Sequence, residues 1–199
     1  MGLGNSLIDK SDVQDALKRL NYDPRTPYLD AIVKEANDSF DDKNEAVMFL
    51  AQTAHETHGF FYIEERDYLG KPGKIATQYG TGAPGKSYHG RGFIQLTWPD
   101  NYRAASRALG MGDRLYRNPE LVSQDISLAA RVSSWYWRDR VRPKAGNMRK
   151  FGLTTKAING ALECRGLNVD QSKNRYRIYK AIARATGVEN LASECGCYN

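Results

Sequence analysis

The sequence has no apolar stretch approaching the ~18 residues that a transmembrane helix needs, and this absence excludes a membrane bundle. It also has no internal repeat and no low-complexity tract. The hydrophobic fraction of 41% and the charged fraction of 26% are ordinary for a globular protein, so a disordered tail protein and a collagen-like chain are excluded as well. A chain of 199 residues is long enough for one compact domain, and we expect residues 1–199 to form a single domain.

Cysteine is scarce: the chain has only Cys164, Cys195 and Cys197. Two cysteines in a Cys-Gly-Cys near the end do not make a zinc-binding pattern. One pair can close a long loop to the C-terminus and leave one thiol over. A disulfide from Cys164 would imply an oxidising compartment.

Residues 1–12 lack the apolar core of ~7–15 residues that a secretory signal peptide needs. Three expectations are compatible with this absence. The protein stays where it is made, it leaves the cell by another route, or the sequence is that of a mature or recombinant chain.

Charge is unevenly distributed along the chain. Residues 1–65 hold 6 Lys and Arg against 13 Asp and Glu, a net charge of −7, whereas residues 66–199 hold 23 against 10, a net charge of +13. Such a basic excess favours a polyanionic partner, which can be nucleic acid, an anionic membrane or a bacterial wall. The alternative is that the basic residues simply coat a solvent-exposed surface.

Helical signals dominate the sequence. Capping and proline signals predict three helix starts: Ser11 with Gln14, Thr26-Pro27, and Asp42 with Glu45. The third of these helices is apolar over most of 46–54, and Gly59 can end it. Apolar spacing predicts further helices at roughly 100–110, 118–137, 154–162 and 172–186.

Strand signal is limited to residues 60–63 and 93–98. Between them, residues 70–92 contain seven glycines, which predicts a long loop, and loops of that length are usually functional or mobile. The chain is therefore expected to be mainly α, with a small irregular or β element in its middle.

Two motifs match nucleotide or metal sites without the context that such sites need. Residues 80–87 (GTGAPGKS) fit the phosphate-binding P-loop, yet no buried strand precedes them and no helix signal follows. The histidines of His55-Glu56-Thr57-His58 are three positions apart, whereas metalloproteases space theirs by four so that both face one zinc ion. We expect no metal and no other cofactor.

Glu56 and Glu65 form the constellation that the sequence favours for catalysis. Glu56 falls in the last turn of an apolar helix, where the helix dipole and burial both favour the protonated acid that a glycosidase needs. Glu65 lies beyond Gly59 and an aromatic run, so it belongs to another element and can face Glu56 across a cleft. A gap of roughly 6.5–9.5 Å would hold a water molecule and give inversion at the anomeric carbon. The alternative is a solvated surface pair.

Two later clusters suit a sugar site, because amides and hydroxyls bond sugar hydroxyl or acetamido groups and aromatic rings cover apolar sugar faces. The first cluster comprises Tyr88, Gln95, Thr97, Trp98, Asn101 and Tyr102. In the second, Asn159 can bind an acetamido group, and Glu163 can pair with Arg175. The alternatives are a buried strand with satisfied polar groups, a simple helix end and superficial ions.

Taken in order, these clusters resemble glycoside hydrolase family 19, which comprises plant-type chitinases, their bacterial relatives and related phage wall lysins. The matching stretches are FLAQTAHETHGFFYIEE (49–65), YHGRGFIQLTWPDNY (88–102), NPELVSQDISLAARVSSWYW (118–137), KAINGALEC (156–164), NRYRIYK (174–180) and CYN (197–199). The resemblance implies a mainly α, two-lobed, lysozyme-like α+β fold, in which a small irregular or β element lies beside a central substrate cleft.

The resemblance also implies roles for individual residues. Glu56 matches the general acid and Glu65 the general base, with Glu64 as the less favoured register, and Thr97 matches a residue that helps to hold the attacking water. Substrate-binding positions are matched by Tyr88, Gln95, Asn101 and Asn159, to which the sugar-site pattern adds Trp98. Charged residues that shape the cleft are matched by Arg91, Glu163 and Arg175. Cys164 with Cys197 resembles the family's C-terminal disulfide, and Cys195 is a rival partner.

The implied reaction is a single-step inverting hydrolysis of β-1,4 bonds beside N-acetylglucosamine. Chitin is the expected substrate, because the cysteine motifs resemble those of secreted chitinases. Peptidoglycan is the alternative, since the basic charge and the missing export signal favour a wall lysin. A carbohydrate-binding protein on a dead scaffold is disfavoured by the presence of both carboxylates. We expect a secreted monomer, or a protein that stays cytoplasmic until host lysis, with no nucleic-acid partner and no membrane insertion.

Overall fold

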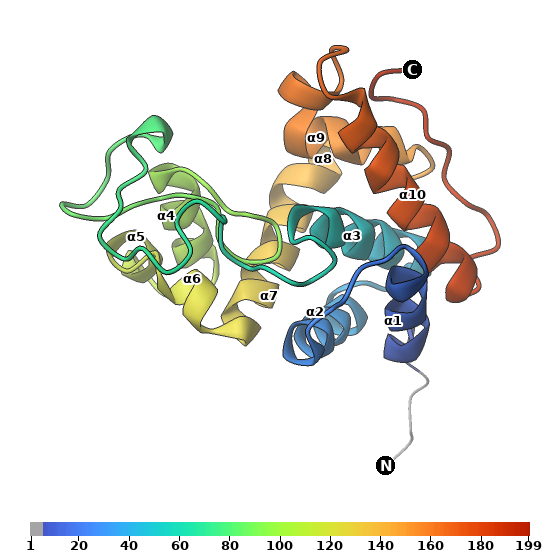
Figure 1. The fold of residues 1–199 in the computed structure, drawn as a ribbon, viewed down its shortest axis with the longest axis horizontal. Helices are drawn as coiled ribbons and strands as arrows, with labels where there is room; N and C mark the ends of the chain where they lie inside the picture. The colour runs from blue at the N-terminus through green and yellow to red at the C-terminus, as the bar shows by residue number, and fades with distance from the viewer. Residues whose placement is uncertain (1–5) are drawn as a thin grey trace.

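The computed structural model describes residues 6–199, and within them the protein is mainly α-helical (Figure 1). Residues 1–5, part of the segment that lacks a signal-peptide core, lie outside the described residues. The helical elements are α1 (Lys10–Arg19), α2 (Thr26–Ser39), α3 (Lys43–Glu56), the 3-10 turn η1 (Thr77–Tyr79), α4 (Pro99–Ala108), α5 (Arg114–Arg117), α6 (Leu121–Gln124), α7 (Ile126–Tyr136), the π-helical turn η2 (Trp137–Val141), α8 (Arg142–Ala145), α9 (Phe151–Glu163) and α10 (Val169–Ala185).

The larger lobe is built around α3. Every residue from Glu45 to Ala54 is buried, because this helix is apolar on nearly all its sides and must be covered all round. Helices α2, α9 and α10 pack against it, and α1 fills the angle between α2 and α10 (Figure 1). The C-terminal end of α3 is therefore held rigidly at the edge of the lobe that faces α7.

The smaller lobe has a separate apolar core, which includes Tyr88, Tyr102 and Leu115. Helix α7 belongs to both lobes: its Ala129 lies in the larger core, whereas its Val132 lies in the smaller one. Figure 1 shows α7 between α3 on one side and α4 to α6 on the other. One helix thus fixes how the two lobes stand relative to each other.

Several predicted helices are confirmed. Helix α2 begins at Thr26, and Asp42 caps α3, where its carboxylate accepts the amide hydrogen of Glu45 at 2.7 Å. Helices also occupy most of the four later ranges that apolar spacing indicated. The range 118–137 is divided between α6 and α7, because Asp125 has extended backbone angles and caps the second of them.

The capping box predicted at Ser11 is wrong. Helix α1 begins at Lys10, and its N-cap is Asp9, whose carboxylate accepts the amide hydrogen of Ser11 at 2.8 Å. Aspartate caps a helix as well as serine does. The sequence therefore contains two equivalent N-cap candidates, Asp9 and Ser11, two residues apart.

The limited strand signals at 60–63 and 93–98 do not correspond to strands. Phe60, Gln95 and Trp98 have φ angles of 64°, 53° and 77°, whereas a strand needs φ near −120°. Within residues 6–199 only isolated bridges occur, and two of them join Arg91 to Glu64 and to Leu96. The middle of the chain is thus an irregular element, and it brings the segment after α3 against the segment before α4.

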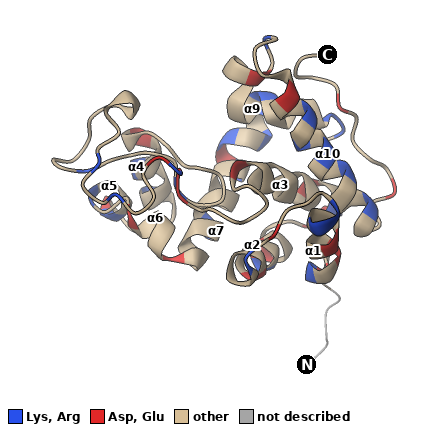
Figure 2. Cartoon of the chain, in the orientation of Figure 1, with Lys and Arg blue, Asp and Glu red and all other residues tan. Residues whose placement is uncertain are grey.

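The charge asymmetry of the sequence is only partly visible in space. In Figure 2 the charged positions of α10 are mainly basic, whereas α1 and α2 carry both acidic and basic positions. All three helices lie in the larger lobe. Acidic and basic positions are therefore mixed within that lobe, and the basic excess does not by itself mark the cleft.

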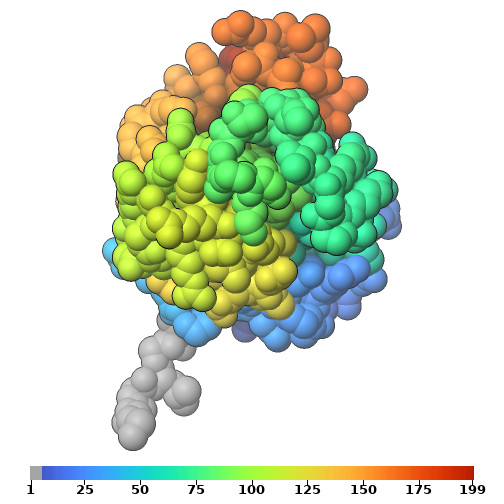
Figure 3. Space-filling model, turned by 90° about the vertical axis from the view of Figure 1, so that its left-hand side faces the viewer, coloured from blue at the N-terminus to red at the C-terminus, as the bar shows by residue number. Residues whose placement is uncertain are grey.

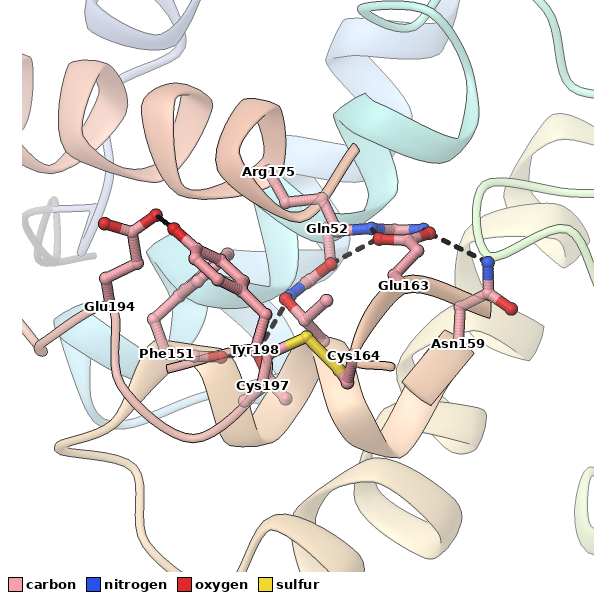
Figure 4. The surroundings of a disulfide bond; sticks show 11 residues. Gln52, Phe151, Asn159, Glu163, Cys164, Arg175, Glu194, Cys197 and Tyr198 are labelled. Atoms are coloured by element: carbon pink, nitrogen blue, oxygen red, sulfur yellow. Dashed lines mark hydrogen bonds and ion pairs between the residues drawn. A yellow bond between two sulfur atoms is a disulfide. The ribbon is translucent and has the colours of Figure 1, made fainter. Parts of the chain in front are cut away.

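Cys164, the residue after α9, forms a disulfide with Cys197 (Figure 4). This is the pairing that the resemblance implied, and Cys195 is left as an exposed free thiol. The two bonded cysteines are 33 positions apart, and α10 lies between them. The bond therefore fastens the C-terminal segment to the end of α9.

Breaking this disulfide should destabilise the protein. We expect the double substitution Cys164→Ser with Cys197→Ser to lower the free energy of unfolding by about 2–4 kcal/mol, because the unfolded chain regains the freedom of the closed loop. Denaturant titration of the variant and the unchanged protein measures the difference. Cys195→Ser removes only the exposed thiol and should change the free energy of unfolding by less than about 0.5 kcal/mol. A double variant as stable as the unchanged protein would contradict this expectation.

Candidate active site

Glu56 is the last residue of α3, and its side chain is 19% exposed. Its Oε1 lies 2.6 Å from Nη2 of Arg175 on α10. Because the preceding turns of α3 are buried, the carboxylate of Glu56 reaches the surface only where the helix ends, between the lobes. Glu56 therefore stands at the cleft on a rigid element, with one oxygen held by a buried cation.

Arg175 is fully buried and binds three side chains at once, of which Gln52 and Glu163 are drawn in Figure 4. Besides Glu56, its Nε and Nη2 donate to the two oxygens of Glu163 at 2.8 and 2.7 Å, and its Nη1 donates to Oε1 of Gln52 at 2.9 Å. Burial alone would lower the pKa of Arg175, but the charges of Glu56 and Glu163 outweigh burial and raise it. The guanidinium is thus a permanent cation that joins α3, α9 and α10.

Asn159 extends this cluster toward the cleft. Its backbone leaves the helical region (φ −140°, ψ 31°) and kinks α9, and its Nδ2 donates to Oε1 of Glu163 at 2.8 Å. Asn159 also lines the same hollow as Glu56. The side-chain amide is therefore held at the edge of the hollow by Glu163.

Glu65 is held by hydrogen-bond donors from the loop. The amide of Gly90 donates to its Oε2 at 3.0 Å, and the hydroxyl of Tyr79 donates to its Oε1 at 2.9 Å. Burial and this contact with Glu65 raise the pKa of Tyr79 to about 12, so the hydroxyl keeps its proton at neutral pH. Both oxygens of Glu65 are thus oriented by neutral groups.

Tyr79 was missed by the sequence reasoning. It lies in the glycine-rich loop, on the short turn η1, and the only signal for it was an aromatic residue in a segment with otherwise small and polar residues. Its ring meets the indole of Trp98 edge to face, with centroids 5.7 Å apart. The loop thus supplies one polar and one aromatic contact at the cleft.

Two adjoining hollows form the cleft, and both are lined by Glu56 and Gln95. The first, of about 580 Å³, is also lined by Glu65. The second, of about 560 Å³, is lined on the smaller lobe by Tyr79, Thr97, Trp98 and Asn101, and on the larger lobe by Asn159 and Leu162. The two predicted catalytic carboxylates therefore face one continuous space between the lobes.

The segment before α4 presents polar atoms to this cleft through an unusual backbone path. Positive φ at Gln95 and Trp98 turns the chain so that Thr97 Oγ1 donates to the carbonyl of Gln95 at 2.8 Å. Asn101 Nδ2 donates to the carbonyl of Thr97 at 2.9 Å. Trp98 is 50% exposed, which is rare for so large an apolar side chain. These four side chains are brought together as the sequence predicted.

Two predicted site residues lie elsewhere. Tyr88 is fully buried in the smaller core, and its hydroxyl donates to the carbonyl of Tyr116 at 2.6 Å. Arg91 is buried behind the cleft, where its Nη1 donates to Ser87 and Tyr102 at 2.8 and 3.0 Å. Neither side chain lines the hollows that contain Glu56, because packing in the smaller lobe takes precedence over the motif.

Glu64 and Glu65 are the two candidates for the general base, and they differ in their hydrogen-bond and ion-pair partners. Glu64 Oε1 lies 2.9 Å from His89 Nε2 and 3.4 Å from Arg91 Nε, whereas Glu65 has no ion pair within residues 6–199. A base that must take a proton is hindered by a cationic partner such as Arg91, because the cation stabilises the charged form of the base. The geometry therefore favours Glu65 over Glu64 as the proton acceptor.

The histidines of the His-Glu-Thr-His motif do not converge. His55 Nδ1 receives a hydrogen bond from Asn174 at 3.1 Å, and burial, with a contribution from Arg175, lowers the pKa of His55 to about 2. His58 is exposed and meets the ring of Tyr22 at 5.4 Å. Across residues 6–199, His, Cys, Asp and Glu form no group of three or more that could hold a metal ion.

Comparison with sequence families and curated proteins identifies relatives of this chain. The profile of the family described as chitinase class I, glycoside hydrolase family 19, matches residues 30–147. Acidic endochitinase SP2 of Beta vulgaris is 41% identical over 177 residues, which cover 84% of this chain and 59% of the relative. Endochitinase EP3 of Arabidopsis thaliana is 42% identical over 151 residues, which cover 75% and 54%. The chain thus spans little more than half the length of these curated relatives.

Solved structures confirm the mainly α fold. Chitinase C from Streptomyces griseus HUT6037 superposes with a TM-score of 0.77 at 29% identity, over 98% of this chain and 100% of that chain. A family 19, class IV chitinase from Zea mays superposes with a TM-score of 0.69 at 27% identity, over 92% and 94%. The similarity therefore extends over both lobes and the cleft between them.

Removing the buried cation should destabilise the larger lobe. We expect Arg175→Met to lower the free energy of unfolding by about 3–5 kcal/mol, because Glu56, Glu163 and Gln52 lose their common partner. Thermal and denaturant unfolding measure the loss. Arg177→Met changes an exposed arginine of the same helix and should cost less than about 0.5 kcal/mol. Equal stability of the two variants would refute the central role of Arg175.

Proposed function

The chain belongs to the chitinase class I family, glycoside hydrolase family 19, and on that premise we propose that residues 1–199 act as one endochitinase domain. The substrate is a β-1,4-linked polymer of N-acetylglucosamine, and chitin is favoured because the relatives are endochitinases. The observation that carries the proposal is the pair Glu56 and Glu65, which line one cleft. Glu56 lies beside the cation of Arg175, whereas Glu65 accepts a hydrogen bond from the neutral hydroxyl of Tyr79.

Glu56 acts as the general acid that protonates the glycosidic oxygen. Its contact with Arg175 fixes one carboxyl oxygen at the edge of the cleft. The positive charge of Arg175 is shared with Glu163, to which it donates two hydrogen bonds.

Glu65 acts as the general base that removes a proton from the attacking water. Tyr79 and Gly90 hold its two oxygens by hydrogen bonds, which orients the carboxylate without neutralising it. Thr97 uses its hydrogen on the carbonyl of Gln95, so its oxygen remains free to accept a hydrogen bond from that water. Attack from the face opposite the leaving group then inverts the anomeric carbon in a single step.

The sugar units lie along the second hollow. The half-exposed indole of Trp98 covers the apolar face of one unit. The amides of Gln95, Asn101 and Asn159 bond hydroxyl and acetamido groups, and the fixed kink at Asn159 sets the direction of one of these bonds. None of these contacts involves a metal ion or another cofactor.

The protein works in an oxidising, extracellular compartment. The Cys164–Cys197 disulfide supports this placement, since such bonds persist outside the reducing cytoplasm. The relatives in Beta vulgaris and Arabidopsis thaliana are endochitinases. Within residues 6–199 we find no helix of the length and apolarity that crossing a membrane would require.

A parallel digestion tests the substrate. Chitin hexasaccharide and purified peptidoglycan are incubated with the enzyme, and the new reducing ends are identified by mass spectrometry. We expect cleavage of the chitin oligomer, with products that are α-anomers in early NMR spectra because the reaction inverts. New N-acetylmuramic acid ends from peptidoglycan, for which the net charge of +6 is the favouring observation, would establish a wall lysin instead. Initial β-anomers would rule out the inverting mechanism.

Substitution of the carboxylates tests their roles. Glu56→Gln and Glu65→Gln should each lower kcat by about 10²–10⁴-fold, because each removes one proton-transfer group. Glu64→Gln is the matched control at the neighbouring position and should keep kcat within about tenfold. Binding of a chitin oligosaccharide, measured by calorimetry, should survive in all three variants. Loss of turnover in Glu64→Gln with turnover kept in Glu65→Gln would move the base by one residue.

A further inference from the structure

A third hollow, of about 500 Å³, lies in the smaller lobe and shares only Glu64 with the cleft. Its walls come from the long loop, at residues 68–75 and 85–91, and from the chain at 120–124. Figures 1 and 3 show these two segments side by side, in teal to green and in yellow-green. The proposed glycosidase reaction uses no side chain that reaches this hollow.

Three residues that line this hollow are connected in series. Ser87 Oγ lies 2.9 Å from Nδ1 of His89, and Nε2 of the same ring lies 2.9 Å from Oε1 of Glu64. The hollow is lined by all three residues. A hydroxyl, an imidazole and a carboxylate in this order are the components of a nucleophilic triad.

The surrounding donors fix the direction of each hydrogen bond. Arg91 Nη2 lies 3.4 Å from Nδ1 of His89, and an arginine can only donate, so Nδ1 carries no proton. The ring proton is therefore on Nε2 and is donated to Glu64. Ser87 must in turn donate its hydroxyl hydrogen to Nδ1, which is the direction that makes its oxygen a nucleophile and the histidine its base.

The imidazole is rigid and neutral. His89 is 3% exposed, and its ring stacks on Tyr68 with centroids 4.3 Å apart and an interplanar angle of 10°. Burial lowers the pKa of His89, which the bond to Glu64 offsets only in part. The ring is therefore available as a proton acceptor at neutral pH.

The hollow also offers groups for a developing negative charge. The amide of Ala76 donates to Ser87 Oγ at 2.9 Å, so a backbone N–H fixes the attacking oxygen and stabilises the negative charge that develops on it as its proton leaves. Lys71 and Lys74 line the hollow as well, and the ammonium groups of both donate to the carbonyl of Asp67. The two lysines favour a substrate that carries negative charge.

We propose that Ser87, His89 and Glu64 form a second catalytic site that hydrolyses esters of short carboxylic acids, such as O-acetyl esters on an anionic carrier. This activity is independent of the proposed cleavage of chitin, and its site is separate from Glu56 and Glu65. The volume of the hollow suits a short acyl group with part of its carrier.

The reaction follows from the directions of the hydrogen bonds. Ser87 Oγ forms a bond to the acyl carbon while its proton moves to His89 Nδ1. The tetrahedral intermediate expels the alcohol oxygen, which takes that proton. Water then attacks the acyl-serine, gives one proton to Nδ1 and forms the carboxylic acid, and the proton returns to Ser87 Oγ as its bond to carbon breaks. Glu64 stabilises the imidazolium that forms in each step.

The same hydrogen bonds have a purely structural reading, in which they only fasten residue 76 to residues 87–89. The two readings differ in the reactivity of one oxygen. A serine that is merely structural does not react with a fluorophosphonate probe, whereas a serine activated by a histidine does.

The first experiment therefore labels the whole, unchanged protein with a fluorophosphonate and maps the labelled peptide by mass spectrometry. We expect the label on Ser87 and its loss in Ser87→Ala. Ser193→Ala, a change at an exposed serine of the C-terminal segment, is the matched control and should be labelled like the unchanged protein. An unchanged protein without label on Ser87 would overturn the proposal, even if Ser87→Ala fails to fold.

The second experiment measures hydrolysis of 4-nitrophenyl acetate by the same proteins. Ser87→Ala and His89→Gln should lower the rate by about 10²-fold or more, and Ser193→Ala should not change it. Cleavage of chitin hexasaccharide and thermal melting, recorded in parallel, show whether each variant is folded. A rate that is equal in Ser87→Ala and the unchanged protein overturns the ester hydrolysis, and it leaves the proposed chitinase activity untouched.

Discussion

The arrangement of the cleft depends on the buried guanidinium of Arg175. An isolated charge in the interior would be prohibitively costly. Here Gln52 and Glu56 from α3 and Glu163 from α9 offset that cost with hydrogen bonds to all sides of one planar group on α10. A guanidinium donates hydrogen bonds only in its plane and at fixed angles. Arg175 therefore sets the relative position of three helices. The contact with Arg175 therefore sets both the position and the electrostatic surroundings of Glu56, the proposed acid.

The second carboxylate is positioned by different means. Glu65 belongs to the irregular segment, which has no helix or sheet to fix it, and hydrogen bonds from Gly90 and Tyr79 orient it instead. The two lobes are joined by α7, whose opposite faces are buried in the two cores. The distance across the cleft is thus set by the packing of α7, whereas the chemistry on each side is set by local donors.

Much of the fold and part of the site could be predicted from the sequence. Apolar spacing and caps indicated most helices, and the ordered motifs indicated Glu56 and Glu65. Tyr79 could not be found, because its role depends on how a glycine-rich loop folds back onto Glu65. Tyr88 matched a substrate-binding position but lies in the smaller core, since a large apolar ring gains more from burial than from exposure at the cleft. The small irregular or β element expected in the middle of the chain is irregular, because positive φ angles at Phe60, Gln95 and Trp98 exclude strands there.

The sequence by itself determined the helical class, the family motifs and the identity of the two proposed catalytic carboxylates, because these depend on spacing and residue type along the chain. Only the tertiary structure decided which partners each charged group has. Glu64 and Glu65 are neighbours in sequence and both line the cleft, yet one meets His89 and Arg91, whereas the other receives hydrogen bonds from Tyr79 and Gly90. Their environments differ because the contacts that set charge and proton affinity come from distant segments, which meet only when the two lobes have packed.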